Sequence, residues 1–99
     1  MNGDMNNSMG KQHIVSLGRL LFEPDVPARL AAAGVTLNDL VQRHQSGDWG
    51  MVDDAEREYL DWAAPLGKTV TSTFLVWIEG KACSVFITTE EKTTYIVMV

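Results

Sequence analysis

The chain has 99 residues, of which 45% are hydrophobic and 21% charged, and its net charge is −5. These values are typical of one soluble globular domain with a single core. No segment approaches the ~20 apolar residues of a membrane helix, and the N-terminus lacks the apolar region of a secretory signal. Cys83 is the only cysteine, so no internal disulfide forms and we expect a cytoplasmic protein without membrane association.

The charge is unevenly distributed along the chain. From Asp48 to Asp61 there are six acidic residues and one arginine, a sum of −5, whereas the remainder carries seven acidic and seven basic residues. Phosphate binding requires clusters of Lys and Arg, which this chain lacks. The pattern therefore predicts no direct binding of nucleic acid, and it favours a protein partner of basic character.

In chain order, the first segment is polar. Residues 1–12 are rich in Asn and Met, which predicts a disordered leader followed by a single domain over residues 13–99. The apolar run from Ile14 to Phe22 is compatible with a short N-terminal strand.

Two helices are predicted next. The first lies within EPDVPARLAAAG, where the cap, the first turn and the stop are assigned to Asp25, Pro27 and Gly34. The second begins at the cap Thr36, with Asp39 three residues later, and ends at Gly47. Its buried stripe follows the spacing i, i+3, i+4 and i+7 and comprises Leu37, Leu40, Val41 and His44.

A third helix is predicted to begin near Asp53 and to end at Pro65 and Gly67. Its acidic residues are expected to face solvent. The residues expected to face the core are Ala55, Tyr59, Trp62, Ala63 and Leu66.

From Thr69 onward the sequence favours strands. TVTSTFLVWI, ACSVFIT and TTYIVMV are rich in β-branched and aromatic residues, and the turns EGK and TEEK separate them. We predict a three-stranded antiparallel meander with one apolar face and one mostly polar face. Helices on the apolar face would complete a two-layer α+β domain.

Motifs for nucleotide, metal and nucleophilic chemistry are incomplete. GKT at 67–69 ends like a phosphate loop, but Trp62 stands where that loop needs glycine, and a strand comes next. His44 and Asp48 would give zinc only two ligands, and it usually takes three or four. A nucleophile would need a histidine beside Ser46, Ser72 or Cys83. We therefore expect no metal and no cofactor.

The stretch RHQSGDWG at 43–50 has two interpretations. In the structural one, His44 packs at a helix end, Gly47 leaves the helix and Trp49 packs back against the core. In the functional one, Trp49 stays partly exposed beside the acidic residues and anchors a partner.

With LVQRHQSGDWG the chain resembles a family of small proteins carried on bacterial plasmids and integrative elements, often labelled plasmid-related protein. The resemblance covers roughly residues 17–98 and depends mainly on Arg43, His44, Gly47, Asp48, Trp49 and Gly50. Weaker matches are Leu17, Gly18, the stretch from Phe86 to Glu90, Thr93 and Thr94. The family's residues in the acidic helix and its Pro-Glu-Glu-Tyr ending are not matched here. The resemblance implies an accessory protein of a mobile element and no catalytic residue.

Our prediction from the sequence is a small non-enzymatic α+β protein that acts by binding another protein, and a homodimer is compatible with it. The expected binding residues are Asp48, Trp49, Asp53, Asp54 and Glu58. The first alternative is an acidic mimic of DNA that inhibits a host defence nuclease. The second alternative is a small enzyme centred on His44 and Asp48.

Overall fold

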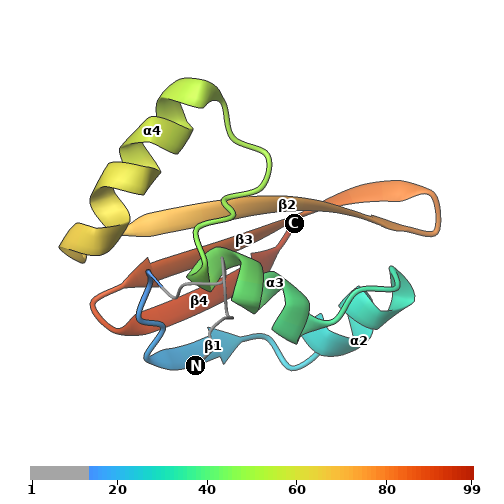
Figure 1. Ribbon diagram of the computed structural model, residues 1–99. Helices are drawn as coiled ribbons and strands as arrows, with labels where there is room; N and C mark the ends of the chain where they lie inside the picture. The colour runs from blue at the N-terminus through green and yellow to red at the C-terminus, as the bar shows by residue number, and fades with distance from the viewer. Residues whose placement is uncertain (1–13) are drawn as a thin grey trace, which may run out of the picture.

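The computed structural model describes residues 14–99, so the predicted leader over residues 1–12 lies outside the described residues. The chain forms an α+β domain in which helices come first and most strands last (Figure 1). None of the helices in the described part has the length and apolar character needed to cross a membrane. The elements are β1 (Arg19–Phe22), α2 (Val26–Ala32), α3 (Leu37–Gln45), α4 (Asp54–Ala63), the 3-10 helix η1 (Ala64–Leu66), β2 (Val70–Ile78), β3 (Lys81–Glu90) and β4 (Thr93–Met98).

The four strands form one mixed sheet in the order β1-β4-β3-β2. Strands β2, β3 and β4 pair antiparallel, whereas β1 pairs parallel with β4. The expected three-stranded meander is thus corrected to a four-stranded sheet. The predicted N-terminal strand is also shorter than the apolar run, because Ile14 and Val15 donate their backbone N–H groups to the Gln45 carbonyl at the end of α3.

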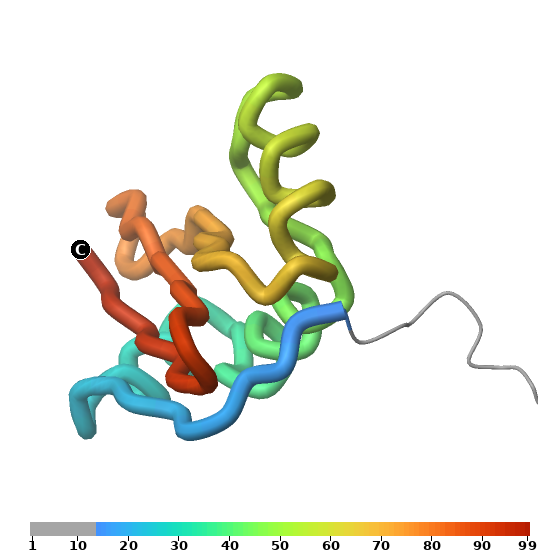
Figure 2. The backbone as a smooth tube through the Cα atoms, turned by 90° about the vertical axis from the view of Figure 1, so that its left-hand side faces the viewer, coloured from blue at the N-terminus to red at the C-terminus, as the bar shows by residue number. Residues whose placement is uncertain are grey.

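Alternate residues of the strands face the helices and form the core. The larger cluster lies between α2, α3 and the sheet and includes Leu30, Leu40, Phe74, Val85 and Ile87. A smaller cluster lies beside α4 and the start of β2 and comprises Val15, Trp49, Leu60, Ala63, Ala64 and Val70. Figure 2 shows that α2, α3 and α4 leave the opposite face of the sheet uncovered.

The helix boundaries depend on local capping chemistry. At the start of α3 the Thr36 hydroxyl accepts from the Asp39 N–H at 3.1 Å, as predicted. The Asp53 carboxylate accepts from the Glu56 N–H at 2.8 Å and caps α4, which is also as predicted. Asp25 occupies the N-cap position of α2, as predicted, but its side chain makes no capping hydrogen bond and only its carbonyl accepts from Arg29.

Helix α4 buries a different face from the one predicted. Leu60, Ala63 and the adjacent Ala64 are buried, at the spacing i, i+3 and i+4. The residues expected inside are exposed, apart from Ala63: these are Ala55, Tyr59, Trp62 and Leu66. The small alanines let α4 approach the core closely at its C-terminal end, and the rest of the helix projects from the body (Figures 1 and 2).

The uncovered face of the sheet is less polar than predicted. Thr71 and Thr73 lie on it, but the same alternation continues through Leu75 and Trp77, which are exposed. The threonines that suggested a polar face occupy the outer positions only in the first half of this strand.

Candidate functional site

The stretch RHQSGDWG ends α3 and carries the chain to the edge of the sheet. The Gly47 N–H donates to the His44 carbonyl at 3.1 Å, and the Asp48 N–H donates to the Arg43 carbonyl at 2.8 Å. This pair of bonds is the Schellman motif, which needs a left-handed residue at Gly47, where φ is +88°. The predicted role of Gly47 as a helix stop is confirmed.

His44 is fully buried and both of its ring nitrogens have hydroxyl partners. Nδ1 lies 2.6 Å from Ser72 Oγ, and Nε2 lies 2.9 Å from Thr89 Oγ1. Thr89 Oγ1 lies 2.7 Å from Thr94 Oγ1, which donates to the Leu17 carbonyl at 2.8 Å. This His44 chain therefore joins α3, three strands and the segment before β1.

The carbonyl of Leu17 fixes the direction of the bonds that lead from it to His44 Nε2. A hydroxyl has one proton, so Thr94, which donates to Leu17, must accept from Thr89. The hydroxyl of Thr89 has then used its proton and must accept from His44 Nε2–H. In the neutral imidazole Nδ1 then carries no proton and accepts from Ser72. Of the two neutral tautomers, only the one protonated at Nε2 satisfies the chain.

Burial opposes a charge on His44. Desolvation lowers the pKa of His44 from 6.5 to about 4. The imidazole is thus neutral near pH 7, in agreement with the hydrogen-bond directions. Because both nitrogens are occupied and the side chain is inaccessible, His44 is placed as a structural residue.

Asp48 contacts Arg43 rather than His44. Its Oδ2 accepts from Arg43 Nε at 2.8 Å, and its Oδ1 accepts from the Gly50 N–H at 3.2 Å. The guanidinium carbon of Arg43 lies 4.5 Å from the centre of the Phe74 ring. The His44–Asp48 pair required by the enzyme hypothesis is not assembled.

Gly50 docks the loop onto the free edge of β2. Trp49 and Met51 exchange backbone hydrogen bonds with Thr73, at 2.9 and 2.7 Å. A Cβ on Gly50 would lie 2.1 Å from the Thr73 carbonyl oxygen, and φ is +78°. Only glycine permits this approach.

Trp49 belongs to the smaller core cluster. It is 2% exposed, and its Nε1–H donates to Asp61 Oδ1 at 2.9 Å. Its ring meets the His44 ring edge to face, with centroids 5.8 Å apart. The expectation that Trp49 would stay partly exposed is wrong, and the interpretation of a packed residue is confirmed.

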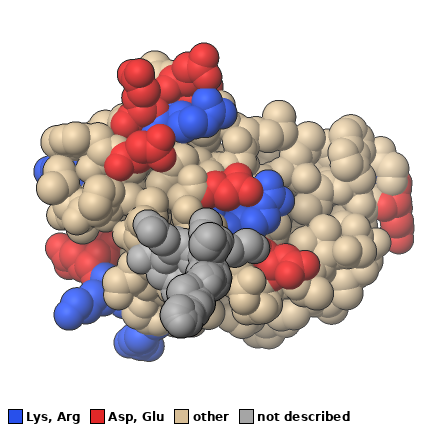
Figure 3. Space-filling view, in the orientation of Figure 1, with Lys and Arg blue, Asp and Glu red and all other residues tan. Residues whose placement is uncertain are grey.

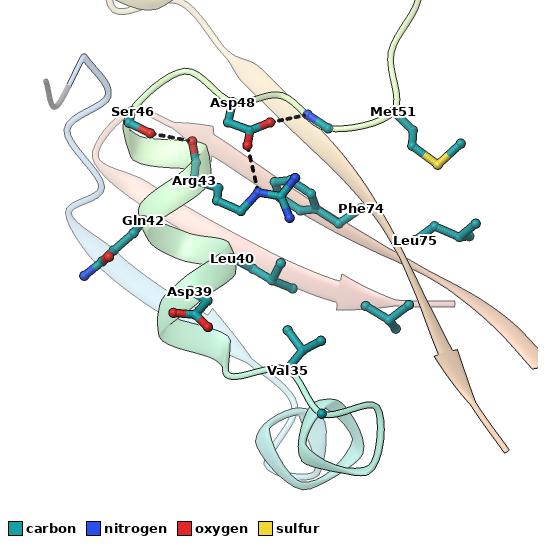
Figure 4. Close-up of a pocket in the computed structure, with 13 residues that line it drawn as sticks. Val35, Asp39, Leu40, Gln42, Arg43, Ser46, Asp48, Met51, Phe74 and Leu75 are labelled. Carbon is teal, nitrogen blue, oxygen red and sulfur yellow. Dashed lines mark hydrogen bonds and ion pairs between the residues drawn. The ribbon is translucent and has the colours of Figure 1, made fainter. Parts of the chain in front are cut away.

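A groove of about 780 Å³ lies between α3 and β2 (Figure 4). Arg43 and Asp48 pair on its wall, and the Ser46 hydroxyl donates to the Arg43 carbonyl. These side chains are used in holding the loop, and the lining residues pair no hydroxyl or thiol with a histidine. Within residues 14–99, no three potential metal ligands come together.

The remaining predicted binding residues lie on or beside α4. Asp53, Asp54 and Glu58 are exposed, and acidic side chains gather over α4 in Figure 3. Asp53 is engaged as the helix cap, and Asp54 pairs with Arg57 at 2.7 Å. The structure thus brings these three acidic residues into one region, whereas Asp48 and Trp49 lie elsewhere in structural roles.

Sequence reasoning missed two groups of residues. Tyr59 and Trp62 are 51% and 55% exposed, with ring centroids 5.8 Å apart, and Lys68 Nζ lies 5.4 Å from the Trp62 ring. The partners of His44 were missed as well, although Ser72 alternates in phase with the buried Val70 and Phe74. A polar residue at an apolar position of a strand was the available signal.

Replacing Thr94 with Val should lower the free energy of unfolding by about 1–3 kcal/mol, because Thr89 loses its acceptor and the Leu17 carbonyl loses its donor. Thr73→Val is the matched control, since it makes the same exchange on the outer face of the sheet. Urea denaturation compares the two variants. Equal stability of both would contradict the directed chain.

Acidification should weaken the fold through His44. Its pKa is about 4 in the folded protein, against the 6.5 of a solvated histidine in the unfolded chain. Unfolding thus takes up a proton between these values, and the stabilisation, fully present above pH 6.5, declines as the pH falls. We expect a loss of about 2 kcal/mol between pH 7.5 and 5 that is absent in His44→Gln. Urea denaturation of both proteins across this pH range tests the prediction. The same dependence of the unfolding free energy on pH in both proteins would refute it.

Trp49→Ala should destabilise the protein by about 3–5 kcal/mol, because it removes a buried indole and leaves Asp61 without its donor. Trp62→Ala, at an exposed position, should change stability by less than about 1 kcal/mol. Thermal melts of the two variants provide the measurement. A small loss of stability in Trp49→Ala would indicate that Trp49 is a surface residue after all.

Comparison with protein-family models, with curated proteins and with solved structures finds no match to this chain. The resemblance of RHQSGDWG to plasmid-related proteins therefore remains an expectation from the sequence. The surfaces of the molecule are left as the basis for a functional proposal.

Proposed function

We propose that this protein is a non-enzymatic binding protein that captures a basic protein partner through α4. The observation that carries the proposal is a stripe of apolar residues that faces solvent. Its members are Ala55, Tyr59 and Trp62, at helical spacing in α4, and Leu66 in the adjoining η1, and we name them the α4 stripe. A helix normally buries its apolar stripe, so an exposed stripe indicates a surface that another molecule covers.

The chemistry of the α4 stripe fits a contact between proteins. Aromatic residues that pack closely in an interface supply much of the binding energy, and Tyr and Trp are the most frequent among them. Tyr59 and Trp62 already lie against each other, so little side-chain entropy remains to be lost on binding.

The charges beside the stripe define the kind of partner. Glu56 and Glu58 are exposed, and no described residue pairs with their carboxylates. Lys68 above Trp62 shows how a cation lies on this ring. A partner with Lys or Arg around an apolar patch would satisfy both the carboxylates and the aromatic rings.

A mimic of DNA is supported less well. The ten residues of α4 span about 15 Å, and Asp53 and Asp54 are used in the cap and in the pair with Arg57. A duplex carries a charge about every 1.7 Å of its axis. The apolar stripe also occupies surface that a mimic would fill with carboxylates. The setting of a mobile genetic element rests on the resemblance of RHQSGDWG alone.

A photo-crosslinking amino acid at Tyr59, with the full chain expressed in the host, should capture one predominant protein, and the same group at Asn38 on α3 should not. Trp62→Ala and the double change Glu56→Lys, Glu58→Lys should each reduce the yield at least tenfold. These positions avoid Asp53, whose reversal would remove the helix cap and cost about 1 kcal/mol. Equal capture from both positions, or a yield unaffected by both variants, would reject α4 as the binding surface.

A further inference from the structure

The face of the sheet turned away from the helices carries an apolar surface of its own. In a strand, alternate side chains point to opposite faces, so the residues between the buried ones lie on this side. We name this set the outer face: its large apolar members are Leu21, Leu75, Trp77, Phe86, Tyr95 and Val97, and its charged members are Arg19 and Glu90.

The register places the larger side chains of the outer face in adjacent rows. Phe86 in β3 lies opposite both Thr73 and Val97, and Leu21 lies opposite Tyr95. Trp77 is 60% exposed and Val97 is 51% exposed. The described residues thus leave a mixed surface across the four strands without a cover, in which these apolar side chains lie beside threonines such as Thr71 and Thr88, whose hydroxyls bind each other at 2.9 Å.

The charged residues of the outer face are Arg19 and Glu90, which carry opposite charges and flank Thr93 at one end of the sheet. The face therefore has no net charge. A foreign protein would normally be selected by a complementary charge, and this face has no excess of either sign to select one. It also offers nothing that would repel an identical face.

The size of the outer face suits a pairing of two copies. With strands about 4.8 Å apart and a rise of about 3.3 Å per residue, the four strands cover roughly 450 Å² in projection. Two copies would bury roughly 900 Å² of projected area, without the extra area that the uneven side-chain surface contributes. This value is close to the ~1,000 Å² that a specific interface exceeds.

We propose that a second copy of this chain packs its outer face on this one, which gives a dimer with four layers: helices, sheet, sheet, helices. Sheets pack in this way about 10 Å apart, with apolar side chains interdigitating between them. A two-fold axis makes the contact self-complementary.

The placement of charge supports an identical partner despite the net charge of −5. The acidic residues of α4 lie on the helix side, so they end on the outside of the dimer and away from the contact. The α4 stripe stays accessible in both copies. The dimer and the proposed partner binding therefore use different surfaces, so an experiment can reject one of the two proposals without rejecting the other.

Sedimentation equilibrium of the full chain at micromolar concentrations tests the dimer. The wild type should show twice the chain mass of 11.0 kDa, and the dimer should persist at high salt because the contact is apolar. Val97→Lys and Trp77→Lys should each raise the dissociation constant at least tenfold, since they place a charge in the contact. Circular dichroism confirms that each variant is folded.

Met51→Lys is the matched control, because Met51 is an equally exposed apolar residue that lies off the outer face, and it should remain dimeric. Val97 and Trp77 lie in different strands, so one variant suffices if the other fails to fold. A wild type that stays at 11.0 kDa would overturn the proposal, as would a dimer that tolerates the lysines.

Discussion

One directed chain of hydrogen bonds, from Ser72 through His44, Thr89 and Thr94 to the Leu17 carbonyl, holds the helix layer in register with the sheet. It crosses a buried region in which an unsatisfied polar group would be costly, so α3 cannot slide or rotate without breaking several bonds together. Neutral histidine suits this place because it accepts at one nitrogen and donates from the other. The same burial that lowers the pKa of His44 keeps it in this form.

The position of α3 determines where the next residues of the chain lie. The chain leaves the helix at Gly47, and each of the next three residues makes a different contact. Asp48 binds Arg43, Trp49 packs in the smaller core cluster, and Gly50 pairs with the edge of β2. Helix α4 packs against Trp49 through Leu60 and Ala63, and the Trp49 Nε1–H donates to Asp61 Oδ1. RHQSGDWG is therefore a structural junction, and α4 depends on it for its placement.

Attachment through small residues explains why α4 exposes its aromatic side. In the smaller core cluster, Ala63 and Ala64 pack with Trp49 and Val70. Tyr59 and Trp62 consequently face solvent, where we propose that they meet a basic protein. The outer face of the sheet is left open for a different reason, since the three helices all pack on the other side.

The sequence predicted those features that depend on neighbouring residues. Thr36 and Asp53 cap their helices and Gly47 ends α3, because caps and stops need only local backbone geometry. It did not predict the parallel pairing of β1 with β4, which joins residues far apart in the chain. The helical spacing of apolar residues in α4 was recognised, but the face that is buried was not. Leu60 with Ala63 and Tyr59 with Trp62 both satisfy helical spacing, so the sequence alone does not separate the two faces.

The exposed aromatic residues were predicted least well, since exposure of an aromatic residue depends on the whole fold. The sequence pattern placed Trp62 in the core and left Trp49 as the candidate anchor, whereas the packing buries Trp49 and exposes Trp62. The buried hydroxyls were detectable in part, because Ser72 interrupts an alternation of apolar residues.

The central claim, that RHQSGDWG is a buried junction built around a neutral His44, is tested most directly by nuclear magnetic resonance of its imidazole nitrogens. We predict a proton on Nε2, slow to exchange with water, and an Nδ1 that stays unprotonated from pH 8 to 5, as a pKa of about 4 requires. A proton on Nδ1 at neutral pH, or a titration near the pKa of 6.5 of a solvated histidine, would contradict the account.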